Sequence, residues 1–227
     1  MKLLILLLCA AWSLVAAPGG AAGQAKPPAP APDRGVFHIS SNGREIGLER
    51  FEIGPSPEGV LAKAELQISI EGAGRMSETA ALVLRRGVEP ASYERIQKSP
   101  KRASATVVFG PEKAAVQYKT PDGDTQDMEF FLPRNVVVLD TNFFHHYTFL
   151  VRQYDFLKGG PQQFNVLVPQ EASPGMVKLE YVGSDQSLRK LVMRTDELEI
   201  EIWADDAGRL IKLAVPSAKV EVVRATK

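Results

Sequence analysis

The chain has 227 residues, of which 44% are apolar and 24% charged, and its formal net charge at pH 7 is zero. These are the values of an ordinary globular protein, and the length suits one large domain or two small ones. Because the charges balance, nothing attracts the whole chain to nucleic acid or to anionic lipid. The sequence also lacks a basic stripe with interleaved aromatic residues, so we expect no nucleic-acid partner.

The N-terminus has the pattern of a secretory signal peptide. Lys2 is followed by the apolar run Leu3–Ala17 and then by small residues, as in segments that direct export. The run is shorter than the roughly 20 residues of a membrane-spanning helix, which disfavours the alternative of a membrane anchor. We assign residues 1–23 to the signal, although three small residues could precede the cut: Ala22, Gly23 and Ala25. The mature chain is then expected to be exported and to have no transmembrane segment.

Cys9 is the only cysteine of the chain. It raises the alternative of a lipoprotein, but Leu8 stands where such a signal has a small residue. If Cys9 leaves with the signal peptide, the mature chain has no cysteine. Disulfide bonds, thiol catalysis and cysteine metal sites are then excluded.

Residues 24–34 form a linker rich in proline and alanine. The sequence KPPAPAPD within it favours an extended tether. We expect the folded part, residues 35–227, to be a single antiparallel β domain that starts near Gly35.

The first folded segments predict a β-hairpin. Val36–Ser40 and Glu45–Ile53 are strand-like, and Asn42-Gly43 between them suits a tight hairpin turn. Pro55 and Pro57 are expected to interrupt this pattern. Apolar and polar residues then alternate strictly, which predicts a strand with one buried face. The inward residues of that strand are Ala62, Ala64, Leu66, Ile68 and Ile70.

Further strands are expected along the rest of the chain. Met76–Arg86 is one, with Ala80, Leu82 and Leu84 pointing inward, and it closes with Gly87 and the segment EPASYERIQ, in which Tyr93 is expected to pack. The other strand-like runs are Ser104–Phe109, Ala114–Lys119, Gln126–Leu132, Val136–Leu139, Gln163–Val168, Met176–Val182, Leu188–Thr195, Glu197–Asp205, Arg209–Val215 and Lys219–Arg224. Roughly a dozen short strands with turns between them predict an antiparallel meander that forms one strongly curved sheet or an incomplete barrel.

One segment, about residues 140–156, predicts a helix. Asp140 or Thr141 can cap its start, and Gly159-Gly160-Pro161 is expected to end it. At helical spacing one stripe is apolar: Phe143, Phe144, Tyr147, Leu150, Val151 and Tyr154. The opposite side is expected to carry His145, Thr148, Arg152 and Asp155. Phe149 and Phe156 are expected to form a second, smaller apolar ridge, with His146 and Gln153 between this ridge and the stripe. We expect this helix to cover the concave side of the sheet.

The order of four motifs resembles the uncharacterised exported β-proteins of bacterial envelopes that are known only as domains of unknown function. The motifs are GVFHISSNGREIGLERFEI, LRRGVEPASYERIQ, LDTNFFHHYTFLVRQYDFLKGGPQQFNVLVP and IEIWADDAGRLIKLAVP, which span most of the chain from Gly35 to Arg224. The resemblance implies a periplasmic or surface location and no established activity. The layout is also similar to envelope lipoprotein carriers, which hold acyl chains between a curved sheet and helices, although a shared fold is weak evidence of function.

Residues that could carry chemistry are few. The chain has three histidines, and the adjacent His145 and His146 diverge by about 100° on a helix, which disfavours a shared metal ion. The Asp122-Gly-Asp124 and Asp205-Asp206 segments could offer carboxylates, but both stand where hairpin turns require Asp and Gly. Phosphate loops, nucleophile elbows and zinc-protease motifs are missing. We therefore expect no catalytic residue, no metal and no cofactor.

The apolar stripe is the remaining feature. It is either core or the wall of a pocket for a lipid-like ligand. The second interpretation assigns ligand binding to Phe143, Phe144, His146, Tyr147, Leu150, Val151 and Tyr154. The leading hypothesis is an exported, non-enzymatic envelope protein that binds an apolar ligand or an envelope partner. The alternatives are a scaffold protein with a fully packed core, and a hydrolase that uses His145 or His146.

Overall fold

The computed structural model describes residues 32–226, except 71, 73, 86, 87, 134 and 172. The expected signal peptide and most of the expected tether lie outside the described residues. The first strand, β1 (Asp33–Ser41), starts slightly before Gly35. It forms the expected hairpin with β2 (Arg44–Ser56). Asn42 and Gly43 have φ values of 51° and 76°, and this left-handed pair makes the kind of turn that fits the twist of a hairpin.

The described residues form a single sheet of 15 strands. Its further strands are β3 (Gly59–Ile70), β4 (Gly74–Arg85), β5 (Glu89–Ser99), β6 (Ala103–Phe109), β7 (Lys113–Lys119), β8 (Thr125–Phe131), β9 (Val137–Val138), β10 (Gln162–Val168), β11 (Ser173–Asp185), β12 (Leu188–Arg194), β13 (Glu199–Ala204), β14 (Leu210–Val215) and β15 (Val220–Arg224). The alternation in β3 is confirmed, because Ala62, Ala64, Leu66 and Ile68 are buried.

The strand order differs from a simple meander in one respect. It runs from β8 back to β1, continues with β15, and then runs back to β9. The first strand therefore pairs with the last, with Phe37 opposite Arg224 and Ser41 opposite Val220. All pairs are antiparallel except β9 with β10, which is parallel.

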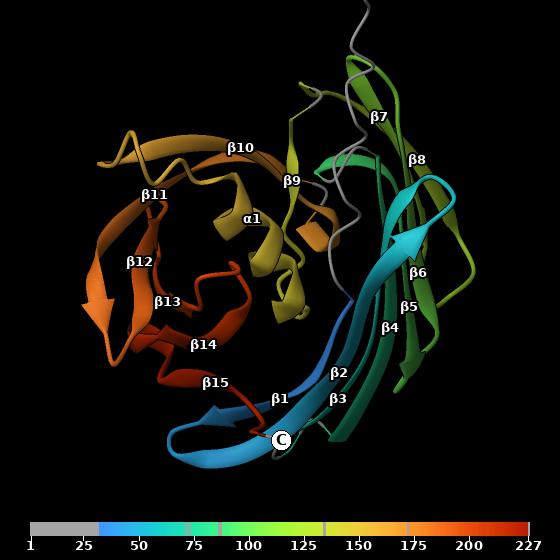
Figure 1. Ribbon diagram of the computed structural model, residues 1–227. Coiled ribbons are helices and arrows are strands. Elements are labelled where there is room, and N and C mark those ends of the chain that lie inside the picture. The colour runs from blue at the N-terminus through green and yellow to red at the C-terminus, as the bar shows by residue number, and fades with distance from the viewer. Residues whose placement is uncertain are drawn as a thin grey trace, which may run out of the picture.

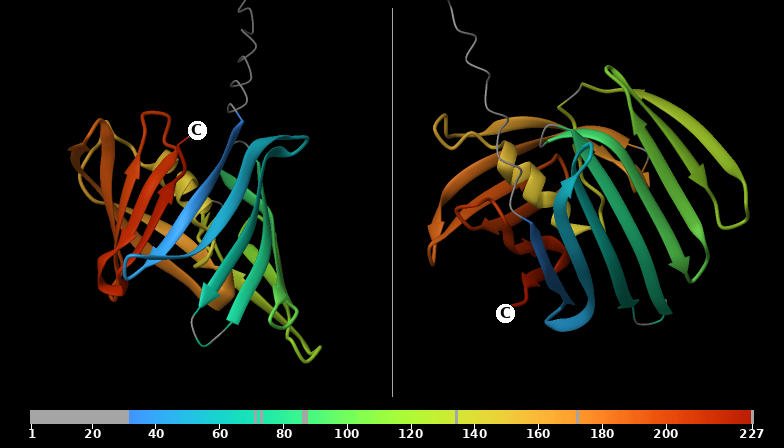
Figure 2. Two further views of the ribbon diagram at one scale, coloured as in Figure 1. Left: turned by 90° about the horizontal axis from the view of Figure 1, so that it is seen from below. Right: turned by 45° about the vertical axis from the view of Figure 1, so that its right-hand side comes forward.

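The sheet curls around its own interior without closing (Figure 1 and Figure 2). Its two edges are β8 and β9. Where the curl comes round, the hydroxyl of Tyr118 on β7 donates to the carbonyl of Pro169 in the short 3-10 helix η2 (Pro169–Glu171). The helix α1 lies on the concave side (Figure 1). The expectation of a mainly β fold with one strongly curved, incomplete barrel and a central helix is confirmed.

The helix is shorter than the expected residues 140–156. It consists of a 3-10 turn, η1 (Phe144–His146), followed by α1 (Tyr147–Gln153). Asp140 accepts a hydrogen bond from the backbone N–H of Asn142 and so stabilises a turn before the helix, not the helix itself. Tyr154 is already extended, with ψ of 125°, and its hydroxyl donates to the carbonyl of Gly160. The residues that flank the helix are thus held by hydrogen bonds outside it. None of the helices in the described ranges is long and apolar enough to cross a membrane.

Two strand expectations were also wrong. β2 runs through Pro55, which pairs with Val60 on β3. Because β1 accompanies β2 only as far as Ile53, one side of β2 needs no N–H donor at Pro55. The segment EPASYERIQ is part of strand β5, although its inward face includes the polar Arg95. Tyr93 is buried there, as expected.

A close backbone approach makes Gly47 on β2 a test of this register. A Cβ added there would collide with the carbonyl oxygen of Gln67 and lie 2.9 Å from the Cα of Ile68. Backbone cannot move aside as a side chain can, so we expect Gly47→Ala to lower the free energy of unfolding by about 1–3 kcal/mol. Gly54→Ala on the same strand is the matched control, since nothing lies within 4 Å of the added Cβ. Urea unfolding of both variants measures the difference, and equal stabilities would contradict the register.

Candidate functional site: a buried polar anchor around the helix

The structure brings all seven expected ligand-binding residues into the interior. The side chains of Phe143, Phe144, His146, Tyr147, Leu150, Val151 and Tyr154 are buried. The six apolar or aromatic members belong to the main hydrophobic core, together with inward residues of the sheet. The stripe is therefore core in this structure, and its role as a ligand-binding surface stays a prediction.

The opposite side of the helix is buried too, although its residues are polar. His145 and Thr148 are both buried, and the Thr148 hydroxyl accepts the backbone N–H of Leu210 at 3.3 Å. The reason is the curl of the sheet, which passes around the helix and covers it on more than one side (Figure 1). The segment approaches solvent only toward its end, where Arg152 of the last turn is half-buried and Asp155, after the helix, is exposed.

A carboxyl group from the sheet holds the start of the helix. Glu49 on β2 is fully buried. Its two carboxyl oxygens accept the backbone N–H groups of Phe144 at 2.7 Å and of His145 at 3.3 Å. The first N–H groups of a helix have no partner within it, so a side chain must supply one. Glu49 does this from a residue 95 positions away in sequence.

The same carboxyl group contacts the His145 ring. The distance from Glu49 Oε1 to His145 Nδ1 is 2.5 Å. The ring also stacks on Phe51, with centroids 5.9 Å apart and planes inclined by 7°. His145 thus lies between a carboxyl group and an aromatic wall, and both come from β2.

A second group of contacts surrounds His146. Its Nδ1 accepts the backbone N–H of Asp140 at 3.3 Å, and the Asp140 carboxyl group accepts the hydroxyl of Tyr93 on β5. The Tyr93 ring meets the His146 ring edge-on, with centroids 5.6 Å apart. The two histidine rings are themselves in contact, with centroids 4.3 Å apart.

An ion pair completes the group. Arg95 on β5 donates to both carboxyl oxygens of Glu78 on β4, at 3.0 and 2.5 Å. The Glu78 side chain is fully buried and that of Arg95 is 14% exposed. The amide of Asn142 lies 3.5 Å from the same carboxylate. We call these eight residues the polar anchor: Glu49, Glu78, Tyr93 and Arg95 of the sheet, and Asp140, Asn142, His145 and His146 of the helical segment.

Burial sets the protonation of the Glu49–His145 pair. Desolvation raises the pKa of Glu49 to about 8, although the N–H groups of Phe144 and His145 oppose the rise. Desolvation lowers the pKa of His145 to about 3, against the attraction of Asp33. At neutral pH the pair therefore shares one proton and carries no net charge.

Asp140 and His146 shift in the same directions. Desolvation raises the pKa of Asp140 to about 6, opposed first by the hydrogen bond from Tyr93. Burial, together with repulsion from His145, holds the pKa of His146 well below its usual range. A neutral imidazole donates through one nitrogen only, so the backbone N–H bonded to Nδ1 places the proton of His146 on Nε2.

The arrangement has part of the geometry of a catalytic base. A carboxyl group on Nδ1 of a histidine is also what orients the base of a hydrolytic triad. The next requirement is a nucleophile at Nε2, yet Nε2 of His145 and of His146 has no hydrogen-bond partner. Both rings are fully buried, so a substrate could reach them only after the helix had moved. In this conformation the pair positions the helix.

Sequence reasoning missed the four sheet residues of the polar anchor as functional groups, although a signal existed for two of them. Glu49 stands two residues before the inward-facing Phe51, and Glu78 two residues before the inward-facing Ala80, so each carboxyl group lies on the buried face of its strand. A carboxyl group on the buried face of a strand requires a partner. The partners, however, come from distant segments and could not be identified from the strand alone.

The acidic turns are confirmed as turns. The Asp205 carboxylate accepts the backbone N–H groups of Ala207 and Arg209 between β13 and β14, and Gly208 has φ of 70°. Asp122 and Asp124 flank Gly123, with φ of 96°, between β7 and β8. In the described residues no cluster of three or more His, Cys, Asp or Glu side chains could hold a metal ion.

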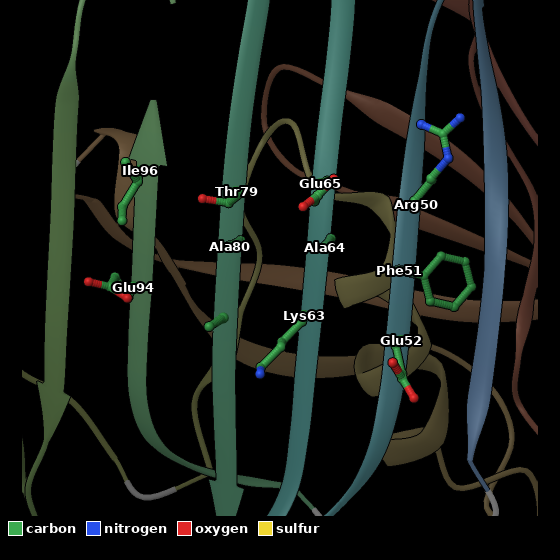
Figure 3. A pocket seen from close by; sticks show the side chains of 11 residues that line it. Arg50, Phe51, Glu52, Lys63, Ala64, Glu65, Thr79, Ala80, Glu94 and Ile96 are labelled. Atoms are coloured by element: carbon green, nitrogen blue, oxygen red, sulfur yellow. The ribbon is translucent and has the colours of Figure 1, made fainter. Parts of the chain in front are cut away.

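A surface depression of about 410 Å³ crosses the outer face of β2 to β5, on the side of the sheet opposite α1. Figure 3 shows its charged lining, in which Lys63 and Glu65 project from β3 and Glu94 from β5, and α1 lies behind the sheet. Acidic and basic side chains alternate there, as on an ordinary solvated sheet face. We assign no site to this depression.

The polar anchor predicts how stability depends on pH. Between pH 4.5 and 8 the folded chain keeps a proton on Glu49 that the unfolded chain releases, so stability falls as the pH rises through this window. Between pH 6.5 and 3, His145 binds a proton in the unfolded chain but stays unprotonated when it is buried in the folded chain. Stability therefore falls as the pH drops through this window. The two effects cancel where the windows overlap. For these two groups we therefore expect a plateau of stability between pH 4.5 and 6.5 and, from pH 6.5 to 8, a loss of about 1.4 kcal/mol per pH unit.

Glu49→Gln tests which group is responsible. The amide can still accept the N–H of Phe144 and can donate to His145, but it does not titrate. We expect the slope between pH 6.5 and 8 to disappear in this variant and to persist in Glu52→Gln, which changes an exposed carboxylate of the same strand. Denaturant unfolding at pH 5.5, 6.5, 7.2 and 8.0 gives the slopes. An unchanged slope in Glu49→Gln would exclude Glu49 as its source.

Comparisons with known proteins identify the fold. No protein-family model and no curated protein sequence matches this chain. Its structure is similar to a β-barrel-like protein of domain of unknown function DUF1849 from Brucella abortus, with a TM-score of 0.55, 8% identity, and coverage of 85% of this chain and 94% of that one. It is also similar to a DUF1089 family protein from Pseudomonas aeruginosa, with a TM-score of 0.52, 13% identity, and coverage of 78% and 92%. The chain therefore has the fold of bacterial β-barrel-like proteins of unknown function.

Proposed function

We propose that this chain is an exported, non-enzymatic binding protein of the bacterial envelope that recruits a partner protein through the surface of its sheet. The observation that carries this proposal is the contrast between the interior and the edges of the sheet. The interior is occupied by a helix whose apolar stripe and histidines are all buried. The sheet nevertheless remains unclosed and ends in a free strand.

Export rests on the sequence. Residues 1–23 have the pattern of a signal peptide, and the only cysteine lies within them. The structurally similar proteins come from Brucella and Pseudomonas, which is consistent with a bacterial source. A cysteine-free mature chain folds without disulfide chemistry, so its folding does not depend on the redox state of the compartment.

Large apolar side chains on the surface support a partner. Phe131 is 89% exposed and Leu157 is 100% exposed. Met176 and Val182 on β11 are also exposed. Single exposed apolar residues are common, but a phenylalanine on an edge strand lies where another chain can pair.

The absence of catalysis is the other part of the proposal. A hydrolase based on His145 or His146 would need a substrate beside rings that are fully buried and lack a bonded nucleophile. The polar anchor gives these residues a structural role that accounts for their burial.

Partner binding can be tested by site-specific photocrosslinking in living cells. Benzoylphenylalanine placed singly at Phe131, Leu157, Met176 or Val182 samples four exposed apolar sites, and the exposed Glu65 is a control. We expect a discrete crosslinked species in the exported fraction from at least one apolar position, and none from position 65. A processed, exported chain that gives no crosslink at any of the four apolar positions would contradict partner binding.

A lipid-like ligand between helix and sheet is the competing prediction, and native mass spectrometry separates the two. A ligand there would have to displace core side chains such as Leu150, which has no exposed surface. We expect the exported chain, purified without detergent, to show the mass of the polypeptide alone. A stoichiometric co-purified lipid would instead support binding at the stripe. It should then be lost in Leu150→Ala and retained in Leu213→Ala, an equally buried leucine on β14.

A further inference from the structure

The edge strand β8 identifies the kind of partner, an inference that rests on the proposed function. Within the described residues β8 pairs only with β7, so its other side is an open edge of seven residues. The strands β6 to β8 extend beyond the rest of the curl (Figure 1 and the right panel of Figure 2). An open edge presents unpaired backbone groups to which another strand can be added.

The hydrogen-bond pattern shows which residues present these groups. Leu132, next to the end of β8, donates its N–H to Glu112 at 2.9 Å. On the other side of β7, the N–H of Gly110 on the β6 side donates to the carbonyl of Lys113 at 2.8 Å. In an antiparallel ladder every second residue pair is hydrogen-bonded. Because Leu132 bonds to the β7 side, the other even-numbered residues of β8 also bond to β7. The N–H and C=O groups of the odd-numbered residues therefore point to the open edge: Thr125, Asp127, Glu129 and Phe131.

The side chains of these four residues give the edge a chemical character. Asp127 lies 2.9 Å from the amide of Gln117, and Glu129 lies 2.8 Å from the ammonium group of Lys113. From residue 120 to 132 the chain has four acidic residues and no basic one. Phe131 ends the strand with an exposed ring. Of the four outward-pointing residues of β8, Asp127 and Glu129 are acidic, although Glu129 is also paired with Lys113 of β7, and Phe131 is apolar. The edge therefore offers acidic groups in its middle and an apolar ring at one end.

We propose that β8 binds an extended segment of a partner protein as an added antiparallel strand. A residue of the added strand that lies directly opposite Phe131, Glu129 or Asp127 projects its side chain to the same face of the sheet as that residue. Read from its N-terminus, the segment should place an apolar residue opposite Phe131, and Lys or Arg opposite Glu129 and Asp127. These three residues are separated by single intervening residues, so the motif is apolar-x-basic-x-basic.

A second copy of this chain does not fit the edge. In antiparallel registers centred on the middle of β8, Asp127 lies opposite Glu129 of the other copy, or one of the two lies opposite itself. Like charges directly across a strand pair are destabilising. The acidic residues thus disfavour self-pairing and at the same time select a basic strand.

The test uses two labelled peptides that differ only in charge. The probe is Val-Thr-Lys-Thr-Lys-Thr-Thr, and its counterpart replaces both lysines with glutamate. We expect the basic peptide to bind at least tenfold more tightly by fluorescence anisotropy at low salt. It should also slow amide hydrogen exchange of Thr125, Asp127, Glu129 and Phe131 at least tenfold. Equal binding of the two peptides, or protection elsewhere on the chain, would overturn the proposal.

Two substitutions at one position separate backbone pairing from charge. Asp127→Pro removes an N–H that points to the open edge and not to β7, so the fold is kept and strand addition is blocked. Asp127→Asn keeps the N–H and removes the charge. We expect the proline variant to abolish binding of the basic peptide and the asparagine variant to weaken it severalfold. In the double variant D127K/E129K the preference should reverse toward the acidic peptide, and a folded double variant that still prefers the basic peptide would overturn the charge assignment.

The crosslinking panel distinguishes failure of this inference from failure of the proposed function. A crosslink at position 131 that is lost in Asp127→Pro supports strand addition at β8. Crosslinks at Leu157, Met176 or Val182 without one at position 131 would overturn the β8 assignment, while recruitment of a partner would stand.

Discussion

The interior of this protein depends on the carboxyl group of Glu49. It supplies the hydrogen bonds that the first turn of the helix lacks, and it contacts the ring of His145. A helical segment of ten residues is marginal in water on its own, so its place must be fixed by tertiary contacts. Buried N–H groups without an acceptor cost about 1–3 kcal/mol each. The helix therefore has one favourable position, in which its N-terminus faces β2.

The helix held by the polar anchor also explains how an unclosed sheet can have a packed apolar interior. A barrel excludes water by joining its edges, whereas here the helix fills the concave side and the sheet only has to curl around it. The two edge strands, β8 and β9, therefore do not have to pair with each other to close a barrel. The structural neighbours share this general architecture at 8% and 13% identity, which shows that many different sequences can form it.

Sequence reasoning succeeded where structure is decided locally. Asn42-Gly43 determines its own turn, and the alternation from Ala62 to Ile68 determines which face of β3 is buried. Sequence reasoning failed where a residue far away in sequence determines the local structure. The helix starts at Phe144, where Glu49 of β2 accepts its N–H, and it ends before Tyr154, whose hydroxyl accepts the backbone N–H of Tyr181 on β11. β5 was not predicted as a strand because the inward-facing Arg95 interrupts its apolar pattern. Arg95 faces inward because it pairs with Glu78.

The pairing of β1 with β15 has a consequence for the order of assembly. During synthesis β1 is among the first segments to emerge, but its partner on one side is completed only when residue 224 has been made. Asn42 then donates to Lys219, and Arg224 reaches Asp33. Long-range pairing of this kind is slow, and an exposed strand is prone to wrong contacts while it waits. The nascent chain carries an incomplete sheet edge through almost its whole synthesis, so a factor that shields β1 would act for longer here than in a protein whose neighbouring strands are consecutive.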